Sequence, residues 1–481
     1  MINKIQENTN DIKNQEKYEN RVRAIICEKS QRLGRPLYVF VQTFGCQQNE
    51  ADSERILGSA ENLGYLKTDS LEDADLIIFN TCAVREHAEL KALSKTGQLK
   101  HLKEKNKELL IGLWGCMVTQ DHRKNDIKMK YPYVDFVAGT NMLHRLPEIL
   151  CDVLVNDRRR YYVEDVSDSQ IVEGVPAARN SDIKAWLSIM YGCDNFCTYC
   201  VVPYVRGRER SRTPDVILDE ANDLVKSGFK DITLLGQNVN SYGKKLPLSE
   251  SKSFSELLRD IAGIDGDFWI RFMTSHPKDA SDELIDAISE NEKIARHFHL
   301  PVQSGSNEIL RRMNRIYTRE HFIELAEKIK KKVPGITLTT DIIVGFPGET
   351  EKDFLDTLDI VKKIEFDSVY SFIYSPRAGT PAAKMEDPVS YEEKSERFSR
   401  LVDTQTKITS KLNAGYLGKT IKVLCESHLQ DANGFLKSRS SGNKIVSFSK
   451  DIPDDLYGKF CDVEITKVSS AQIFGKLKKV Y

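Results

Sequence analysis

Between residue 36 and about residue 150, short apolar runs alternate with longer stretches in which apolar and charged residues recur at helical spacing. Apolar runs of this length are typical of buried strands, and the stretches between them are typical of amphipathic helices. Strands and helices in alternation predict an α/β layer around a mostly parallel sheet. The clearest runs are YVFVQTFGC, ADLIIFNTC and LLIGLWGC.

The same alternation returns from about residue 183 to residue 376, with six candidate strands. Six units are two short of a full (β/α)8 barrel, so we expect a partial (β/α)6 barrel that is open on one side. Its active site is expected at the carboxyl ends of the strands. The candidate strands are LSIMYGC, DITLLGQ, WIRFMTS, HFHLPVQ, TLTTDIIVGF and SVYSFIYS.

After Pro388 the pattern changes to one long charged helix and then to short apolar strands separated by turn signals, which predict a small β-barrel over residues 415–481. This segment holds 11 Lys and Arg against 7 Asp and Glu, a surplus of 4. Such a surplus fits an RNA-binding barrel and also an inert cap. Phe435, Phe448 and Phe474 could stack on bases or belong to the barrel core.

The N-terminal segment, the cysteine count and the net charge limit which classes of protein are possible. Residues 1–35 are charged and lack clear periodicity, so we expect a flexible segment there. Ten cysteines without an apolar signal-peptide core argue for a reducing compartment, and the net charge of −1 forces no partner. No run approaches membrane-spanning length. We expect a cytoplasmic protein with ordered domains at 36–150, 183–412 and 415–481.

Three cysteines lie in one short run, YGCDNFCTYC, and we call Cys193, Cys197 and Cys200 the loop triad. A cubane cluster has four irons, so a loop that supplies three thiolates leaves one iron open to another ligand. A structural zinc site uses four protein ligands, and the nearest histidines, His144 and His276, are far off in the sequence. Ligand count therefore favours an iron–sulfur cluster over structural zinc.

Each of the three apolar runs of the first domain ends in a cysteine, and we call Cys46, Cys82 and Cys116 the strand-end triad. The carboxyl ends of parallel strands share one edge of a sheet, so these cysteines can converge. Most free cysteines are small buried hydrophobes. Three at the same position, two of them after Gly45 and Gly115, fit a second cluster better. The other cysteines share no spacing and are expected to be structural or incidental: Cys27, Cys151, Cys425 and Cys461.

From residue 36 to the C-terminus the chain resembles the radical S-adenosylmethionine (SAM) methylthiotransferases. The resemblance rests on the two triads and on VVPYVRGRERSR, LLGQNVNSYG, RFMTSHPKD, HLPVQSGSNEILRRMNR, DIIVGFPGET and FIYSPRAGTPAA. GQNVNSYG and TSHPKD look like the branch that forms 2-methylthio-N6-dimethylallyladenosine at tRNA position 37, next to the anticodon. The branch acting on N6-threonylcarbamoyladenosine in tRNA is the alternative. A non-catalytic, metal-braced RNA-binding protein is a further alternative, but it would need no half-open barrel.

The resemblance implies two [4Fe–4S] clusters and two SAM molecules per turnover. One SAM would chelate the open iron of the loop-triad cluster, and an electron from that cluster would break a carbon–sulfur bond to give a 5′-deoxyadenosyl radical. A radical suits carbon 2 of adenine, whose C–H bond offers little to acid–base catalysis. The cluster on the strand-end triad would hold the inserted sulfur, and the second SAM would supply the methyl group.

The resemblance also implies individual contacts with SAM. Tyr199 matches an aromatic residue that packs on the adenine of SAM, although an ordinary tyrosine fits equally well. Gly345 and Glu349 in VGFPGE match a SAM-contacting stretch, although a plain β-to-α turn explains them too. Gln237 and Gln303 place polar groups at strand ends, where a barrel has its active site.

A basic cluster follows the loop triad: Arg206, Arg208, Arg210 and Arg212, interrupted by Glu209. A charge run is usually a solvated face. Beside a site that receives a phosphate-rich substrate, however, these arginines predict contacts with SAM or RNA.

The resemblance finally implies partners. The C-terminal barrel resembles a TRAM domain, an RNA-binding module, so tRNA is the expected substrate. An electron donor protein such as flavodoxin or ferredoxin is expected, and a monomer. The sulfur donor stays open.

Overall fold

The computed structural model describes residues 2–156, 159–163, 171, 173–449 and 455–481. The chain forms two compact units. The first unit comprises Met1–Asn180, Tyr191–Asp194 and Val201–Arg210; the second comprises Ser181–Met190, Asn195–Cys200 and Ser211–Tyr481. The loop triad is thus divided, because Cys193 belongs to the first unit while Cys197 and Cys200 belong to the second.

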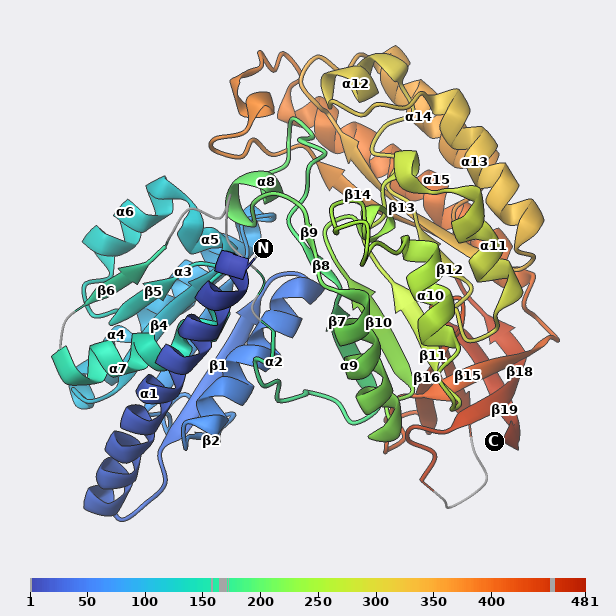
Figure 1. The fold of residues 1–481 in the computed structure, drawn as a ribbon. Coiled ribbons are helices and arrows are strands. Elements are labelled where there is room, and N and C mark those ends of the chain that lie inside the picture. The colour runs from blue at the N-terminus through green and yellow to red at the C-terminus, as the bar shows by residue number, and fades with distance from the viewer. Residues whose placement is uncertain (1, 157–158, 164–170, 172, 450–454) are drawn as a thin grey trace. The chain divides into compact units, whose positions relative to one another are not determined.

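The first unit is built on one parallel sheet with the strand order β2-β1-β3-β4-β5-β6 (Figure 1). All residues of β3 and β4 are buried, because helices cover both faces of the sheet. This confirms the predicted α/β layer. The strands are β1 (Tyr38–Phe44), β2 (Leu66–Lys67), β3 (Leu76–Thr81), β4 (Leu110–Gly115), β5 (Phe136–Ala138) and β6 (Arg160–Tyr162).

Two apolar cores lie on the two faces of this sheet. One joins the sheet to α1, α2 and α7, and the other joins it to α3, α5 and α6. Alternate residues of β3 divide between them, with Leu76 and Ile78 in the first core and Ile77 and Phe79 in the second. The helices are α1 (Ile2–Leu33), α2 (Gln47–Asn62), α3 (Glu86–Gln98), α4 (Lys100–Lys105), α5 (Cys116–Thr119), α6 (Asp121–Lys130) and α7 (Leu146–Asn156).

Helix α1 corrects the expectation of a flexible segment at residues 1–35. Val22 and Ile26 lie one helical turn apart and are buried in the core that also contains residues of α7. This apolar stripe is narrow in an otherwise charged sequence, so periodicity alone did not indicate a helix.

The second unit contains the six expected parallel strands of the half-barrel, which confirms that prediction. They hydrogen-bond in the orders β11-β10-β7 and β12-β13-β14. A backbone bridge between Ile270 and Ile294 connects β11 to the segment that leads into β12. The strands are β7 (Lys184–Ser188), β10 (Asp231–Leu235), β11 (Trp269–Phe272), β12 (His297–His299), β13 (Thr337–Val344) and β14 (Ser368–Ile373).

Amphipathic helices follow these strands and bury their apolar faces in one large core with them. The helices are α9 (Pro214–Lys226), α10 (Phe254–Ala262), α11 (Asp282–Glu290), α12 (Asn307–Arg312), α13 (Arg319–Lys332), α14 (Glu351–Ile364) and α15 (Tyr391–Ala414). The short elements β8 (Met190–Tyr191), α8 (Val202–Val205) and β9 (Arg210–Ser211) lie in the segments where the chain passes between the two units.

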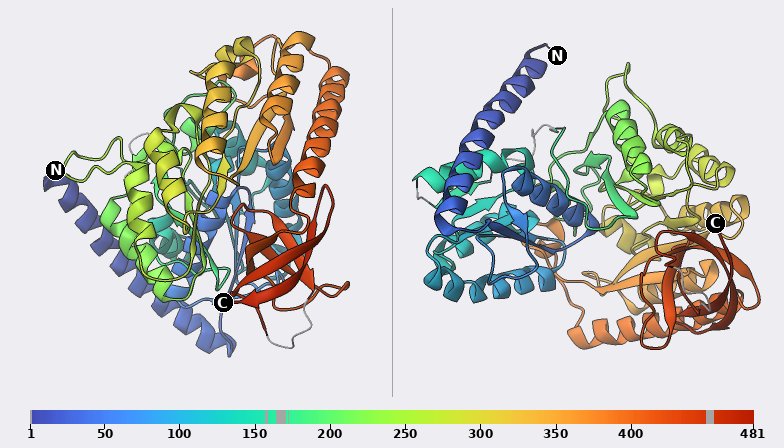
Figure 2. Two further views of the ribbon diagram at one scale, coloured as in Figure 1. Left: turned by 90° about the vertical axis from the view of Figure 1, so that its right-hand side faces the viewer. Right: turned by 90° about the horizontal axis from the view of Figure 1, so that it is seen from below.

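The C-terminal strands form a closed barrel in the order β15-β16-β17-β19-β18 (Figure 2), as predicted. Phe448 lies in the barrel core, whereas Phe435 and Phe474 are partly exposed with ring centroids 5.2 Å apart. Cys425 and Cys461 are core residues. The strands are β15 (Thr420–Cys425), β16 (Phe435–Ser440), β17 (Ile445–Ser449), β18 (Phe460–Val468) and β19 (Ile473–Val480).

This barrel belongs to the same compact unit as the half-barrel, although the sequence favoured a separate domain. Arg271 of β11 donates to the carbonyl oxygens of Ser440 and Ser441, and the Trp269 and Phe460 rings lie 4.8 Å apart. These contacts tie the barrel to β11. None of the helices in the described part of the chain has the length and apolar character that a membrane crossing needs.

Candidate functional site

The strand-end triad lies along one edge of the first unit's sheet. Strands β1, β3 and β4 are neighbours, and their last residues are paired in register. Cys46 follows β1 as the residue before α2, Cys82 follows β3, and Cys116 follows β4 as the first residue of α5. The register therefore brings together three cysteines that are far apart in the sequence, as the strand-end argument predicted.

The two glycines that precede cysteines in this triad allow the strand ends to approach closely. A Cβ atom on Gly45 would lie 2.8 Å from the Cβ of Cys82. Gly115 has φ +99°, and its Cβ would lie 2.4 Å from Oδ1 of Asn80. Any other residue at these positions would force the strand ends apart.

The three thiols have different acidities. Cys46 is exposed, and a hydrogen bond from the Cys82 thiol lowers its pKa to about 6. The same hydrogen bond, together with burial, raises the pKa of Cys82, and burial raises the pKa of Cys116 to about 11. One thiolate is thus available near neutral pH on the exposed side of the triad, where a metal would arrive.

A buried ion pair lies beside this triad, within the first unit. The Arg206 guanidinium donates to Oδ2 of Asp52 at 2.7 Å and to Oδ1 of Asn49 at 3.2 Å, and its charge favours the Cys116 thiolate. Asn49 in turn donates to the carbonyl oxygen of Thr81 at 3.0 Å. Asp52 and Asn49 are not among the predicted site residues, although polar residues at helical spacing directly after Cys46 carry a signal.

Contacts within the first unit hold the start of the loop triad, Gly192 and Cys193, in place. In the first unit the backbone N–H of Cys193 donates to the carbonyl oxygen of Gly207 at 3.2 Å. Gly192 has φ +78°, and a Cβ there would lie 2.0 Å from the carbonyl oxygen of Arg208. The glycine of YGC is therefore required by the close approach of that carbonyl.

In the second unit, residues 195–200 are fastened to the segment around α12. The Thr198 hydroxyl donates to the carbonyl oxygen of Arg312 at 2.8 Å, and its N–H donates to that of Met313 at 3.1 Å. The Asn314 amide donates to the carbonyl oxygen of Phe196 at 3.1 Å. These bonds fix the backbone that carries Cys197.

Arg315 is the buried charge closest to the loop triad in the second unit. Its Nη1 donates to Sγ of Cys197 at 3.3 Å, its Nε to the Tyr317 hydroxyl at 2.9 Å, and its Nη2 to the carbonyl oxygen of Pro301 at 2.8 Å. This arginine is not among the residues predicted from the sequence. It is the last residue of the motif HLPVQSGSNEILRRMNR. Only its burial and its hydrogen bond to Cys197 distinguish it from the other arginines of that motif.

Both cysteine triads consist of thiol side chains, the ligand type that iron–sulfur clusters use. In the described residues, no group of three His, Cys, Asp or Glu side chains is arranged to hold one metal ion. A cubane makes a different demand, because each thiolate binds its own iron. The uncompensated positive charge of Arg315 beside Cys197 also calls for an anionic group, which a cluster held by thiolates provides.

Tyr199, Gly345 and Glu349 lie within the second unit. Tyr199 packs edge-on against Phe346, with ring centroids 6.4 Å apart. The buried Glu349 carboxylate accepts from the Gly345 N–H at 2.9 Å and from Arg397 at 3.0 Å, and burial raises its pKa to about 7. Glu349 thus holds the VGFPGE turn in shape, with Gly345 at φ +67°. Contacts of these residues with SAM stay predictions.

Polar groups gather after β10 and β11 of the half-barrel, where Gln237 also lies. Oδ1 of Asn238, both amide atoms of Asn240 and the hydroxyl of Ser275 are buried with no hydrogen-bond partner among the described residues. Each such atom costs about 1–3 kcal/mol, which a bound polar ligand or water would offset. Asn240 and Ser275 are not among the predicted site residues, although they lie in the motifs LLGQNVNSYG and RFMTSHPKD.

Gln303 follows β12 and has φ +71°, which is unusual for a residue with a side chain. It is buried, and its backbone bonds to Asp341 and Ile343 of β13 hold it there. Strained positions of this kind cluster at functional sites. A role in binding SAM or RNA stays a prediction.

The basic cluster does not form one solvated face. Arg206 and Arg212 are buried, Arg208 is half exposed and pairs with Asp194 at 3.3 Å, and Arg210 donates to the Arg206 carbonyl oxygen at 2.9 Å. Their contacts with SAM or RNA stay predictions.

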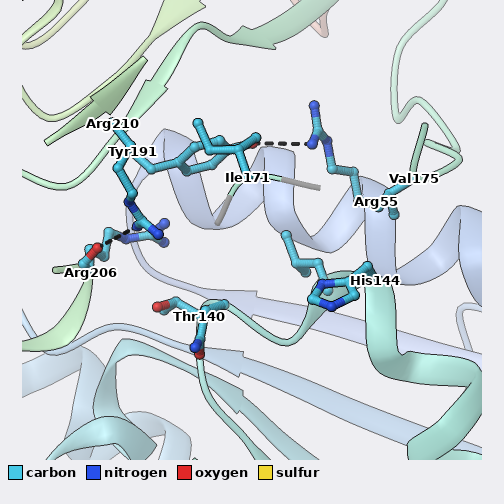
Figure 3. Close-up of a pocket in the computed structure, with 10 residues that line it drawn as sticks. Arg55, Thr140, His144, Ile171, Val175, Tyr191, Arg206 and Arg210 are labelled. Atoms are coloured by element: carbon cyan, nitrogen blue, oxygen red, sulfur yellow. Dashed lines mark hydrogen bonds between the residues drawn. The ribbon is translucent and has the colours of Figure 1, made fainter. Parts of the chain in front are cut away.

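Arg206 and Arg210 line a pocket of the first unit (Figure 3) that encloses about 500 Å³ with its open mouth included. Arg55 lines it as well and donates to the Tyr191 hydroxyl at 3.1 Å. His144 and Thr140 complete the polar wall. Three guanidinium groups in one wall suit an anionic ligand.

Two family models match the chain. Residues 187–361 match the Radical SAM superfamily, and residues 38–139 match the family described as Uncharacterized protein family UPF0004. These ranges cover the half-barrel and the sheet that carries the strand-end triad.

Curated relatives match nearly the whole chain. A tRNA-2-methylthio-N(6)-dimethylallyladenosine synthase of Clostridioides difficile (strain 630) is 47% identical over 97% of both chains. One of Alkaliphilus oremlandii (strain OhILAs) is 51% identical over 91% of this chain and 92% of that protein. Among solved structures, the radical S-adenosylmethionine methyltransferase TsrM from Kitasatospora setae, with a tryptophan substrate and a SAM analogue bound, aligns with a TM-score of 0.52 at 15% identity. The alignment covers 72% of this chain and 75% of that one.

Proposed function

Because the chain belongs to the family of tRNA-2-methylthio-N(6)-dimethylallyladenosine synthases, we propose that it inserts sulfur and a methyl group at carbon 2 of N6-(dimethylallyl)adenosine at tRNA position 37. The observation that carries the proposal is the convergence of Cys46, Cys82 and Cys116 at the ends of adjacent parallel strands. A cluster on this second set of cysteines would hold the sulfur that the enzyme inserts into the base.

In this proposal the loop triad holds one [4Fe–4S] cluster and the strand-end triad holds another. When bound, a cluster with an open iron supplies the one-electron chemistry that cleaves SAM. Arg315 balances the charge at Cys197, and the Glu349–Gly345 bond holds the VGFPGE turn in shape. The unpartnered amide of Asn240 and the hydroxyl of Ser275 offer polar contacts to SAM or to the base.

The partners follow from this reaction. We assign tRNA as the substrate, a flavodoxin or ferredoxin as the electron donor, and a monomer in the cytoplasm as the working form. The partly exposed pair Phe435 and Phe474, with Lys467 5.8 Å from the Phe474 ring, gives the C-terminal barrel a surface on which bases can stack. The threonylcarbamoyladenosine alternative has no specific support from the relatives named above.

Anaerobic reconstitution tests the chemistry. We expect about eight irons per chain and formation of 5′-deoxyadenosine from SAM and reductant. Cys193→Ala should abolish SAM cleavage, whereas Cys82→Ala should retain cleavage and lose sulfur insertion. Methylthio product from the Cys82→Ala enzyme would contradict the role of the strand-end triad, and zinc in place of iron would contradict the whole proposal.

Mass spectrometry of tRNA nucleosides tests the substrate. A strain lacking this protein should lose the 2-methylthio form of N6-(dimethylallyl)adenosine and regain it when the intact chain is supplied. Loss of a threonylcarbamoyl derivative instead would assign the chain to the other reaction.

A further inference from the structure

Arg315 differs from the other buried cations of the second unit. Among the described residues of that unit, five Lys or Arg residues are buried, and four of them pair with a carboxylate. Arg315 makes no such ion pair in the described part of the chain. The other four are Arg212, Arg271, Lys394 and Arg397.

The Arg315 guanidinium is fixed in place on three sides. Its bonds to Cys197, Tyr317 and Pro301 use all three of its nitrogens. The Tyr317 hydroxyl is itself anchored, because it donates to the carbonyl oxygen of Val302 at 2.8 Å. The positive charge is therefore held rigidly at the sulfur of Cys197 with only neutral oxygens around the rest of it.

A charge held in this way interacts unequally with the two oxidation states of a cluster. A cubane core of charge 2+ bound by three thiolates carries one net negative charge, and reduction by one electron adds a second. A fixed cation attracts the more negative state more strongly, and a buried site screens this attraction weakly. A positive charge at Cys197 therefore favours the reduced cluster.

We propose that Arg315 is a positioning residue that stabilises the reduced state of the cluster held by the loop triad, and so makes its reduction ahead of SAM cleavage accessible. The inference rests on the proposed function, because it assumes a cluster on these cysteines. In the step concerned, an external one-electron donor of the flavodoxin or ferredoxin class loses one electron and the cluster core passes from 2+ to 1+. No proton moves.

A redox titration followed by electron paramagnetic resonance tests this inference. The parent is the full chain with Cys46, Cys82 and Cys116 changed to Ala, so that only one cluster is present, and SAM is left out. For Arg315→Met we expect the ratio of reduced to oxidised cluster at fixed potential to fall at least tenfold, which corresponds to about 59 mV for a one-electron couple. Arg315→Lys keeps the charge and should shift the ratio less.

Arg271→Met is the matched control. It removes a buried guanidinium that pairs with its own carboxylate, Asp231, at 2.8 Å, so it should leave the potential unchanged. An Arg315→Met protein with four irons and the parent's potential would overturn the inference. If this variant retains no cluster, Arg315→Gln, which still offers a hydrogen-bonding amide, replaces it. Loss of the cluster from both variants would assign Arg315 to cluster retention and would also overturn the inference.

SAM cleavage with two reductants gives a second readout. Arg315→Met should form at least tenfold less 5′-deoxyadenosine with dithionite, and the stronger reductant titanium(III) citrate should restore most of the loss. A loss that is equal with both reductants would point to a purely structural role. A parent that binds no iron or cleaves no SAM would instead contradict the proposed function, before any Arg315 variant is compared.

Discussion

Each of the two cysteine sites has a buried arginine at a thiol, but only one of these arginines has a carboxylate partner. Arg206, beside Cys116, pairs with Asp52 at 2.7 Å, whereas Arg315, beside Cys197, pairs with no carboxylate in the described residues. The two arginines therefore differ in whether a carboxylate compensates their charge. A buried arginine can therefore bring an uncompensated positive charge to one site and a compensated charge to the other.

The proposed reaction accounts for this difference. A cluster that must accept an electron benefits from an uncompensated cation, which stabilises its reduced state. A cluster that holds sulfur for methylation benefits from electron-rich sulfur, and a compensated arginine withdraws less charge from it. Asp52 thus serves to neutralise Arg206 while the guanidinium continues to hold the triad.

Removal of Asp52 tests the difference between the two arginines most directly, and we expect it to have the largest effect on stability. Asp52→Ala leaves a buried and unpaired Arg206, which should cost roughly 3–5 kcal/mol of the free energy of unfolding of the metal-free protein. Denaturant unfolding measures this loss. Asp52→Leu combined with Arg206→Met removes both charges and should recover most of it. If the single variant is as stable as the parent, Asp52 does not compensate Arg206.

The glycines that precede cysteines give a second test of the comparison, because both sites depend on such glycines. Gly115→Ala should cost about 1–3 kcal/mol through its positive φ, with a further loss from the approach of Asn80. Iron content should fall by up to half, since only the strand-end cluster is lost. Gly192→Ala should remove the other half. Gly228→Ala, at φ +93° with no atom within 4 Å of its Cβ, is the control and should keep all the iron.

The sequence predicted those parts of both sites that follow from local pattern. Apolar runs that end in cysteine revealed the strands and the convergence of Cys46, Cys82 and Cys116, because strand ends in a parallel sheet share an edge. The pairing of Arg206 with Asp52 joins residues 154 positions apart, so no local pattern could reveal it. Arg315 reaches Cys197 across 118 positions for the same reason.

The sequence also predicts only some of the polar residues near the strand ends of the half-barrel. Gln237 and Gln303 are predicted site residues because they follow predicted strands, and their roles stay predictions. Asn240 follows β10 and Ser275 follows β11, and only burial without a partner distinguishes them from ordinary loop residues. Helix α1 was missed because two buried residues, Val22 and Ile26, are too few to create a visible period.

The smallest expected effect concerns the acidity of Cys46, the exposed thiol of the strand-end triad. In the metal-free protein, alkylation of Cys46 by iodoacetamide should rise with pH around a midpoint near its pKa of about 6, because the Cys82 thiol donates a hydrogen bond to the thiolate. Cys116 should react only well above that pH, because burial raises its pKa to about 11. Peptide mass spectrometry across a pH series follows both residues.

Cys82→Ala is the informative variant for this prediction. It removes the hydrogen bond that lowers the pKa of Cys46, so the midpoint should move upward toward the ordinary value of 9.0. Arg206→Met should move the midpoint upward by less, since the guanidinium favours the thiolate only through the longer-range charge. A midpoint unchanged by Cys82→Ala would show that the low pKa has another cause. The charge of Arg206 and the backbone N–H of Asn49, which also favour the Cys46 thiolate, would then account for it.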